Sequence, residues 1–253
     1  MSTSRPIVIT PYYKEDRALL SCCIASVRNQ TIPTEHLLVA DGHPQDWIDG
    51  EPVRHLRLDR SHADFGNTPR GVAALLAASE GYFPIMMLDA DNWLEPQHVE
   101  VCLGAAGPDT DYVVAKTYLR RPDGSVMPIP PPPAHEHVDT SCFAFFPGSY
   151  PTLALWALMP REMSPLGDRV FWAALRARGL SGVEIQNPRT VNYHCVWEVF
   201  YKALGETPPP EAKPNIDAQP ILQWWLGLSA REREMATRLA GTSLEALLKG
   251  PSA

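Results

Sequence analysis

The sequence lacks the features that place a chain in a membrane or in an oxidising compartment. None of its 253 residues belongs to an apolar run approaching the ~18 residues that span a bilayer, and the N-terminus has no signal-peptide pattern. The five cysteines are an odd number and include no C-x-x-C pair, so a disulfide framework is not expected. We therefore expect a cytoplasmic protein without a transmembrane segment.

Excess positive charge and glycine-rich phosphate loops are also missing. Lys plus Arg is 22 against 29 for Asp plus Glu, and the net charge of −7 provides no general attraction for nucleic acid. No G-x-x-x-x-G-K-[ST] segment is present, and no G-x-G-x-x-G follows the first expected strand. A phosphate site in this chain would therefore need a metal ion.

The apolar content is sufficient for a core, at 45% against 20% charged residues. Over the first ~115 residues, short β-branched runs alternate with helical patterns, which predicts an α/β fold with a mostly parallel central sheet flanked by helices. Strands are expected at 7–10, 36–40, 53–58, 84–88 and 112–115, and helices at 19–27, 68–79 and 96–103. Ligands bind such sheets at the carboxyl ends of the strands.

After residue ~115 the regular alternation of strand and helix patterns ends. A turn at 120–124 is followed by a proline run at 128–133 that must be an extended loop. A strand is expected at 141–146 and a helix at 168–178. A proline-rich strap at 203–220 leads to a helical region at 221–249, where Trp224 and Trp225 could pack on the core or form a homodimer face.

Two carboxylates follow the apolar strand expected at 84–88. Asp89 and Asp91 are separated only by Ala90, and like charges held this close need relief. A divalent cation such as Mg²⁺ is held by one or two carboxylates together with substrate phosphates. The pair therefore suggests a metal-bridged diphosphate site. The alternative is that one aspartate caps the next helix and the other faces water.

Several segments together resemble family 2 glycosyltransferases with the GT-A fold, over roughly residues 6–200. They are residues 7–15, 26–30, 39–42, 67–92 and 167–172. The resemblance implies a nucleotide-sugar donor, a divalent metal (Mn²⁺ or Mg²⁺) and inversion at the anomeric carbon. UDP is the favoured nucleotide, with GDP and dTDP open. The resemblance also implies a nucleotide-binding half at 1–115, an acceptor-binding half at 116–203, and an extension at 204–253 outside this GT-A-like domain.

The resemblance assigns nucleotide-binding roles to residues that follow the first, second and fourth expected strands. They are Thr10, Pro11, Tyr12 and Asp41 for the base and ribose, and Asp89 for the ribose and metal side. An aromatic face suits a nucleobase, and Tyr12 and the adjacent Tyr13 are both candidates for stacking.

The remaining roles are the metal ligands and the catalytic base. The resemblance makes Asp91 a metal ligand, with His194 as a further one, and makes Asp168 the general base that accepts the acceptor's proton. The alternative for Asp168 is an N-cap or early-turn aspartate on the helix expected at 168–178, which the helix dipole would favour. Gly167 departs from the family pattern, in which an acidic pair is common at this point.

The acceptor is open among a glycan, a lipid-linked sugar and a small molecule. Asp139–Ser141 are candidates to line its pocket, and His135–His137 are interpreted as part of a loop over it. Two other functions compete. A nucleotidyltransferase would have a basic, glycine-rich loop in place of residues 11–15. A catalytically silent nucleotide-sugar-binding module would keep the fold without turnover.

Overall fold

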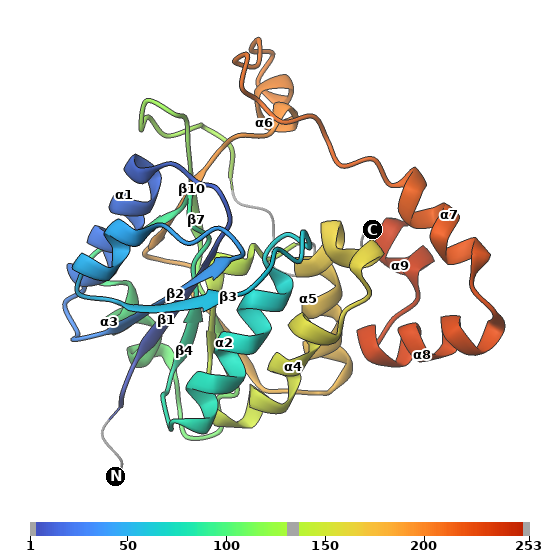
Figure 1. Ribbon diagram of the computed structural model, residues 1–253, viewed down its shortest axis with the longest axis horizontal. Helices are drawn as coiled ribbons and strands as arrows, with labels where there is room; N and C mark the ends of the chain where they lie inside the picture. The colour runs from blue at the N-terminus through green and yellow to red at the C-terminus, as the bar shows by residue number, and fades with distance from the viewer. Residues whose placement is uncertain (1–3, 131–136, 250–253) are drawn as a thin grey trace.

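The computed structural model describes residues 4–130 and 137–249 and contains a seven-stranded sheet in the order β3-β2-β1-β4-β8-β6-β9 (Figure 1). Only β8 runs antiparallel to its neighbours, so the predicted mostly parallel sheet is confirmed. The strands are β1 (Ile7–Tyr12), β2 (Glu35–Asp41), β3 (Arg54–Leu58), β4 (Ile85–Met87), β6 (Tyr112–Val114), β8 (Phe143–Phe145) and β9 (Gly182–Glu184).

Helices flank this sheet, as the alternating pattern predicts. They are α1 (Arg17–Arg28), α2 (Asn67–Ser79), α3 (His98–Ala105), α4 (Tyr150–Leu158) and α5 (Gly167–Ala177). Helices α2 and α4 lie side by side, and α5 adjoins α4 (Figure 1). The α2–α4 contact is close because Gly71 has no side chain: a Cβ there would lie 2.5 Å from the backbone nitrogen of Ala157.

Sequence periodicity did not predict α4. Thr152, Leu153, Leu155 and Trp156 are all buried, and the helix is almost entirely apolar, so it has no polar stripe to mark a period. The strand expected at 141–146 is shorter than predicted. Its first part is the 3₁₀ helix η2 (Thr140–Cys142), and only β8 pairs in the sheet.

A second sheet of three short strands was also not predicted. Strand β10 (Val191–His194) lies between β5 (Trp93–Leu94), to which it is antiparallel, and β7 (Thr117–Arg120), to which it is parallel. Residue 192 pairs with residue 93. This register places the end of β10 beside the turn that follows β4.

The chain beyond residue 203 divides into an irregular strap at 204–218 and three helices. Helix α6 (Glu198–Ala203) precedes the strap, and α7 (Gln219–Gly227), α8 (Ala230–Ala240) and α9 (Leu244–Lys249) follow it. A Ser229 capping box starts α8, and Gly241, at φ +71°, ends it. Ile221 and Trp225 are buried in the main core, so this extension packs on the rest of the chain.

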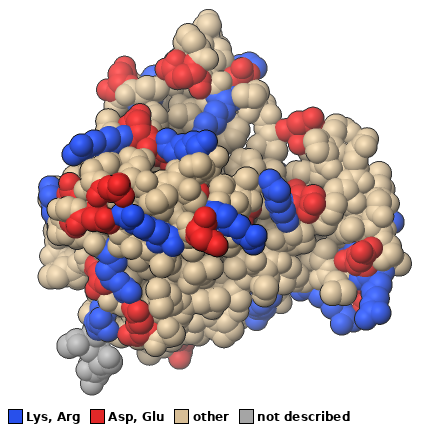
Figure 2. Space-filling view, in the orientation of Figure 1, with Lys and Arg blue, Asp and Glu red and all other residues tan. Residues whose placement is uncertain are grey.

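Several further features of the structure bear on what the sequence predicts. The turn at 121–124 is present, and the other short 3₁₀ helices are η1 (Asp46–Gly50), η3 (Pro147–Ser149) and η4 (Arg161–Leu166). All five cysteines are free. Among the described helices, none is both long and apolar enough to cross a bilayer. Acidic and basic side chains are interspersed on the face shown in Figure 2. The expected loop residues His135 and Glu136 lie outside the described residues.

Candidate active site

The carboxyl edge of the sheet, formed by the ends of β1, β2 and β4, brings most of the expected site residues together. These three strands are parallel, so Tyr12, Asp41 and the turn 89–92 after β4 share one edge. The end of β10 and the start of α5 complete the surroundings of that turn.

Asp89 has a buried cation beside it. Arg70 of α2 donates to Asp89 Oδ1 at 2.6 Å and to Asn67 Oδ1 at 3.1 Å, and its guanidinium lies 4.8 Å from the centroid of the Trp156 ring. Arg70 is only 4% exposed. Part of the charge relief expected from a metal is therefore supplied by an arginine, and Asp89 is held in one orientation.

Asp91, unlike Asp89, has no cationic side chain paired with its carboxylate among the described residues. Among the described residues, none donates a side-chain hydrogen bond or forms an ion pair with its carboxylate. Burial is the main cause that raises the pKa of Asp91 to about 7, and the charges of Asp89 and Glu15 act in the same direction. The positive charge of Lys213 opposes this shift. A cation at this point would favour the ionised form of Asp91.

The turn that carries both aspartates is tied to two other elements. The Asp89 backbone N–H and the Asn92 side-chain amide donate to Ser141 Oγ of η2 at 3.1 and 2.9 Å. Asn92 Oδ1 accepts from the backbone N–H of His194 at 2.9 Å. The structure thus brings His194 to the turn of Asp91, as the proposed ligand pair requires.

The His194 ring has a free coordination position. Its buried Nδ1 has no hydrogen-bond partner, and burial, followed by the charge of Lys213, lowers the pKa of the ring. A neutral imidazole is the form that binds metals. Over residues 4–130 and 137–249, however, no group of three or more His, Cys, Asp or Glu side chains is arranged to hold a metal ion. A metal here would need ligands from a substrate.

The carboxylate of Asp41, at the end of β2, is hydrogen-bonded to a neighbouring loop. Asp41 is 4% exposed and accepts from the backbone N–H of His62 at 3.0 and 3.1 Å and from His62 Nδ1 at 2.6 Å. Sequence reasoning missed His62, because it lies in a loop after β3 with no motif around it. The pair fixes that loop against the carboxyl edge.

The side chains of Thr10 and Tyr12 do not face the open edge. They lie on the same face of β1, and that face packs on α1. The Thr10 hydroxyl is 2.9 Å from His36 Nε2 in the interior. The Tyr12 ring is 2% exposed, so of the two tyrosines expected to stack on a base, only Tyr13, 40% exposed, has an accessible face. Tyr13 packs edge-on against His43 with 4.6 Å between ring centroids.

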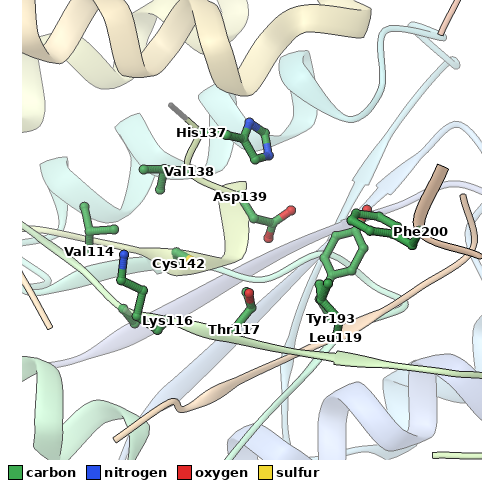
Figure 3. Close-up of a pocket in the computed structure, with 11 residues that line it drawn as sticks. Val114, Lys116, Thr117, Leu119, His137, Val138, Asp139, Cys142, Tyr193 and Phe200 are labelled. Carbon is green, nitrogen blue, oxygen red and sulfur yellow. The ribbon is translucent and has the colours of Figure 1, made fainter. Parts of the chain in front are cut away.

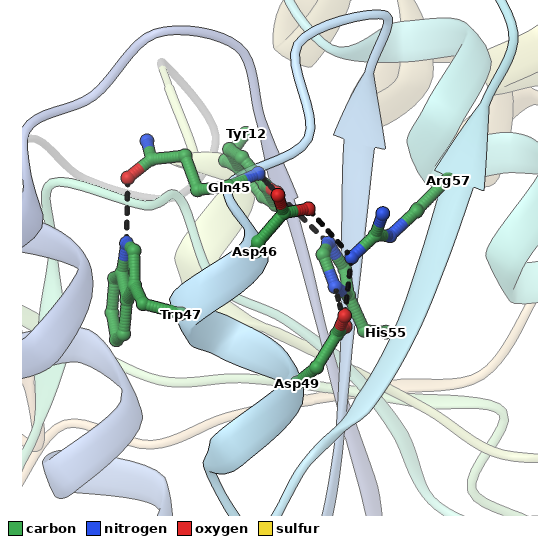
Figure 4. Close-up of polar contacts among 7 residues, drawn as sticks. All are labelled: Tyr12, Gln45, Asp46, Trp47, Asp49, His55 and Arg57. Atoms are coloured by element: carbon green, nitrogen blue, oxygen red, sulfur yellow. Dashed lines mark hydrogen bonds and ion pairs between the residues drawn. The ribbon is translucent and has the colours of Figure 1, made fainter.

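The Tyr12 hydroxyl belongs to a network around η1 (Figure 4). The Gln45 backbone N–H donates to it at 3.0 Å, and it lies 2.8 Å from His55 Nε2. His55 Nδ1 is 2.8 Å from an Asp49 oxygen, and Arg57 pairs with the same carboxylate. The network joins β1, η1 and β3 into one rigid unit. Pro11, between Thr10 and Tyr12, is buried against Gly66.

Asp168 lies in the first turn of α5, the early-turn position named as its alternative role, and the N-cap is Leu166. Its Oδ2 is 3.4 Å from His137 Nε2, and both side chains are partly exposed, at 26% and 33%. Gly167 has a steric reason to be glycine: a Cβ there would lie 2.9 Å from the Asn67 amide nitrogen. An acidic residue at 167 would displace Asn67, which holds Arg70.

A cavity of about 120 Å³, shown in Figure 3, is lined by His137, the neighbour of Asp168, but not by Asp168 itself. Its lining is mostly apolar and consists of Val114, Ala115, Lys116, Thr117, Leu119, His137, Val138, Asp139, Cys142, Tyr193 and Phe200. The carboxylate of Asp139 points into the cavity (Figure 3), while Lys116 is paired with Glu184. Of the three residues expected to line the acceptor pocket, Asp139 lines this cavity, whereas Thr140 and Ser141 are not part of its lining.

Asp139 is the most perturbed carboxylate of the site. Burial raises its pKa to about 8, and the negative charges of Asp89 and Asp168 contribute to the rise. Its Oδ1 accepts from the backbone N–H of Ser141 at 2.9 Å. At neutral pH this group is largely protonated and can donate a hydrogen bond into the cavity. Perturbed carboxylates of this kind concentrate at functional sites.

Comparison with known proteins agrees with this geometry. Residues 7–141 match the sequence model of glycosyl transferase family 2. This chain belongs to that family. Over 96 residues it is 27% identical to EpsH of Bacillus subtilis (strain 168), a protein named as a glycosyltransferase. That match covers 36% of this chain and only 28% of EpsH.

Solved structures of S. aureus TarS show the same fold. TarS 1–349 in complex with UDP superposes with a TM-score of 0.59 and 12% identity, over 93% of this chain and 70% of that one. A second TarS structure gives 0.55 and 13%, over 95% of this chain and 44% of that one. At this identity the likeness establishes the fold alone. The family 2 chain described here has the GT-A fold.

Proposed function

We propose that this protein is a metal-dependent, inverting glycosyltransferase that moves a sugar from a nucleoside diphosphate sugar, with UDP favoured, to an acceptor hydroxyl. One observation carries the proposal. Two chemically different acidic places lie near one another: the partly unmatched turn of Asp91 and His194, and the cavity lined by Asp139 and by His137, the neighbour of Asp168. The family and the UDP complex of TarS support the donor class.

The residues of the turn fit a divalent ion completed by a substrate. Asp91 supplies an oxygen ligand without a competing partner, and the orphaned Nδ1 of His194 supplies a nitrogen. Mn²⁺ and Mg²⁺ sites commonly combine few protein ligands with phosphate oxygens. When bound, such an ion would neutralise charge on the departing diphosphate. Asp89, paired with Arg70, would orient the turn and face the ribose.

Asp168 is the proposed general base. Its carboxylate would accept the proton of the acceptor hydroxyl as the oxygen attacks the anomeric carbon, and His137 would orient it at 3.4 Å. Attack opposite the leaving diphosphate inverts the anomeric configuration. The cavity would receive part of the acceptor, with protonated Asp139 donating a hydrogen bond to it. Acceptor binding is accordingly assigned, as part of the proposal, to residues 116–203.

Nucleotide binding is assigned to residues 1–115, with 204–253 as an extension. Asp41 and Pro11 would shape the base site, and Tyr13 offers an exposed ring. Thr10 and Tyr12 would contribute through their backbone and by rigidity, because their side chains are buried. The free cysteines support the expectation of a cytoplasmic protein. The acceptor and a homodimer remain expectations.

A thermal-shift grid tests the proposal. UDP, GDP, dTDP and CDP are each added with Mn²⁺, Mg²⁺ or EDTA. A ligand at about 100 times its Kd adds about 2.7 kcal/mol, which raises Tm by about 5–10 °C for a chain of this size. We expect one nucleotide to give this shift, EDTA to remove it, and Asp91→Ala to abolish it.

The matched control is Asp46→Ala, which removes an exposed carboxylate of η1 and should keep the shift. A grid without any shift would refute nucleotide binding. Metal-dependent binding without turnover of the corresponding nucleotide sugar, in the presence of acceptors or water, would instead favour the silent binding module.

A further inference from the structure

We infer that Lys213, in the strap at 204–218, is a binding cation for the diphosphate of the nucleotide donor. The inference rests on the proposed function and goes beyond it, because that proposal assigns no ligand contact to the strap. Figure 1 shows the strap as an irregular segment that crosses from α6 to α7. The inference concerns Lys213, where main-chain hydrogen bonds tie the strap to the segment after β10.

The backbone of Lys213 is bonded on both sides to the segment that follows β10. Its N–H donates to the Val196 carbonyl at 2.6 Å, and its carbonyl accepts from the Glu198 N–H at 3.0 Å. Residues 197 and 213 form an isolated parallel bridge. The position of Lys213 is therefore set by main-chain geometry, although proline-rich irregular chain surrounds it.

A short path of bonded neighbours connects this point to the acidic turn. Val196 follows His194 by two residues, and the His194 N–H is bonded to Asn92, the residue after Asp91. Lys213 is near enough for its positive charge to act on both Asp91 and His194. The main-chain bonds of the strap thus hold a cation near the acidic turn.

The ammonium of Lys213 has no carboxylate of its own. Within the described part of the chain it forms no ion pair, and it lies 5.7 Å from the centroid of the Trp197 ring. Lys116 and Lys202 are in contrast paired with Glu184 and Glu198. An exposed, unpaired ammonium held beside a phosphate site gains a charge-assisted contact when the ligand arrives.

The same position explains how an acidic turn can accept an anionic ligand. Asp89, Asp91 and Glu15 all carry negative charge near it, and Arg70 is already used by Asp89. A diphosphate would meet repulsion there unless cations face it from another direction. A metal ion is one such cation, and Lys213 is a second one that belongs to the chain itself.

Calorimetric titration of UDP and of uridine, with Mn²⁺ present, tests the inference on the full chain. We expect Lys213→Ala to weaken UDP binding by roughly 10- to 100-fold, the range of a hydrogen bond to a charged group, and to leave uridine binding unchanged. Lys213→Arg should restore most of the UDP affinity. Lys202→Ala, which removes a lysine from neighbouring α6, should have no effect on either ligand.

Three results would overturn the inference. Unchanged UDP affinity in Lys213→Ala would show that the ammonium does not contact the diphosphate. An equal loss for UDP and uridine, unrepaired by arginine, would show that the strap only supports the fold. Loss of UDP binding in Lys14→Ala but not in Lys213→Ala would place the cation beside Tyr13 instead. If the wild type binds neither ligand, the proposed function fails as well, which separates the two failures.

Discussion

The two sides of the carboxyl edge differ in how their polar groups are matched. On the side of β1, β2 and β3, Asp41 is bonded to His62 and the Tyr12 hydroxyl is enclosed by Gln45 and His55. On the side of β4, β10 and α5, the pKa values of Asp91 and Asp139 are raised to about 7 and about 8, and His194 keeps an orphaned nitrogen.

This difference distinguishes polar groups that stabilise the fold from polar groups that are available to bind a ligand. Buried polar groups that find partners within the chain stabilise one geometry and change little when a substrate binds. Buried carboxylates without such partners destabilise their ionised forms, and a cation or a proton-donating substrate can relieve them. We therefore assign binding and chemistry to the second side and shaping of the base site to the first.

The largest expected effect is the loss of turnover when Asp168, on the side of α5, can no longer accept a proton. Asp168→Asn keeps the size of the side chain but cannot accept a proton, so kcat should fall by roughly 100- to 10,000-fold. UDP affinity with Mn²⁺ should stay within about twofold of wild type, because the residue is assigned to the acceptor. Steady-state kinetics with the donor found in the nucleotide grid, together with UDP titration, measures both values.

Asp109→Asn, at an exposed position, is the control for removal of one negative charge. Nearly unchanged turnover in Asp168→Asn would show that the base is a different group, and Asp139 would then be the first to examine.

A smaller effect concerns pH on the side of the turn. Asp91 must lose its proton to bind a metal, and its pKa is about 7. The affinity for Mn²⁺ should therefore fall about tenfold for each pH unit below 7 and become constant above 7. Burial lowers the pKa of His194 and so favours the neutral ring that can bind a metal. Titration of free Mn²⁺ by electron paramagnetic resonance, without nucleotide, measures the profile.

Asp91→Asn should bind Mn²⁺ weakly and without this pH dependence. A wild-type profile that is flat between pH 5.5 and 8.5 would contradict the assignment of Asp91 as the titrating ligand.

The smallest expected effect is a loss of stability, without a loss of binding, on the side of β1, β2 and β3. Tyr12→Phe removes a hydroxyl that accepts from Gln45 and contacts His55, which should cost about 1 kcal/mol and lower Tm by about 2–4 °C. UDP affinity should not change, since the ring is 2% exposed. A thermal melt and a UDP titration are compared with those of Tyr13→Ala, for which the opposite pattern is expected. Reduced UDP affinity at unchanged Tm in Tyr12→Phe would place its hydroxyl on the ligand.

Most strands and helices of the first half could be predicted from the local pattern of apolar and polar residues. The strands at 7–12, 35–41 and 54–58 and the helices at 17–28 and 67–79 lie within two residues of the predicted bounds. Their apolar runs are long enough to show a period and are bounded by polar or glycine residues. Helix α4 lacked such a period, and β5 and β10 are too short to show one.

Local pattern located part of the site, at the strand ends. Asp41, Asp89 and Asp91 follow apolar strands directly, so their meeting at one edge is a consequence of parallel pairing. Arg70 and His62 have no such marker. Their roles depend on which helix or loop is packed against the edge, and nothing local in the sequence specifies that.

The sequence by itself determined the α/β class and the acidic residues at the carboxyl edge, because both depend on short-range patterns of apolar and polar residues. Tertiary structure alone decided which acids are matched. Arg70 reaches Asp89 from α2, whereas Asp91 is left beside His194 and Lys213, which lie about 100 residues or more further along the chain. Charge energies depend on distance and burial in space, and only the packed chain sets these two quantities.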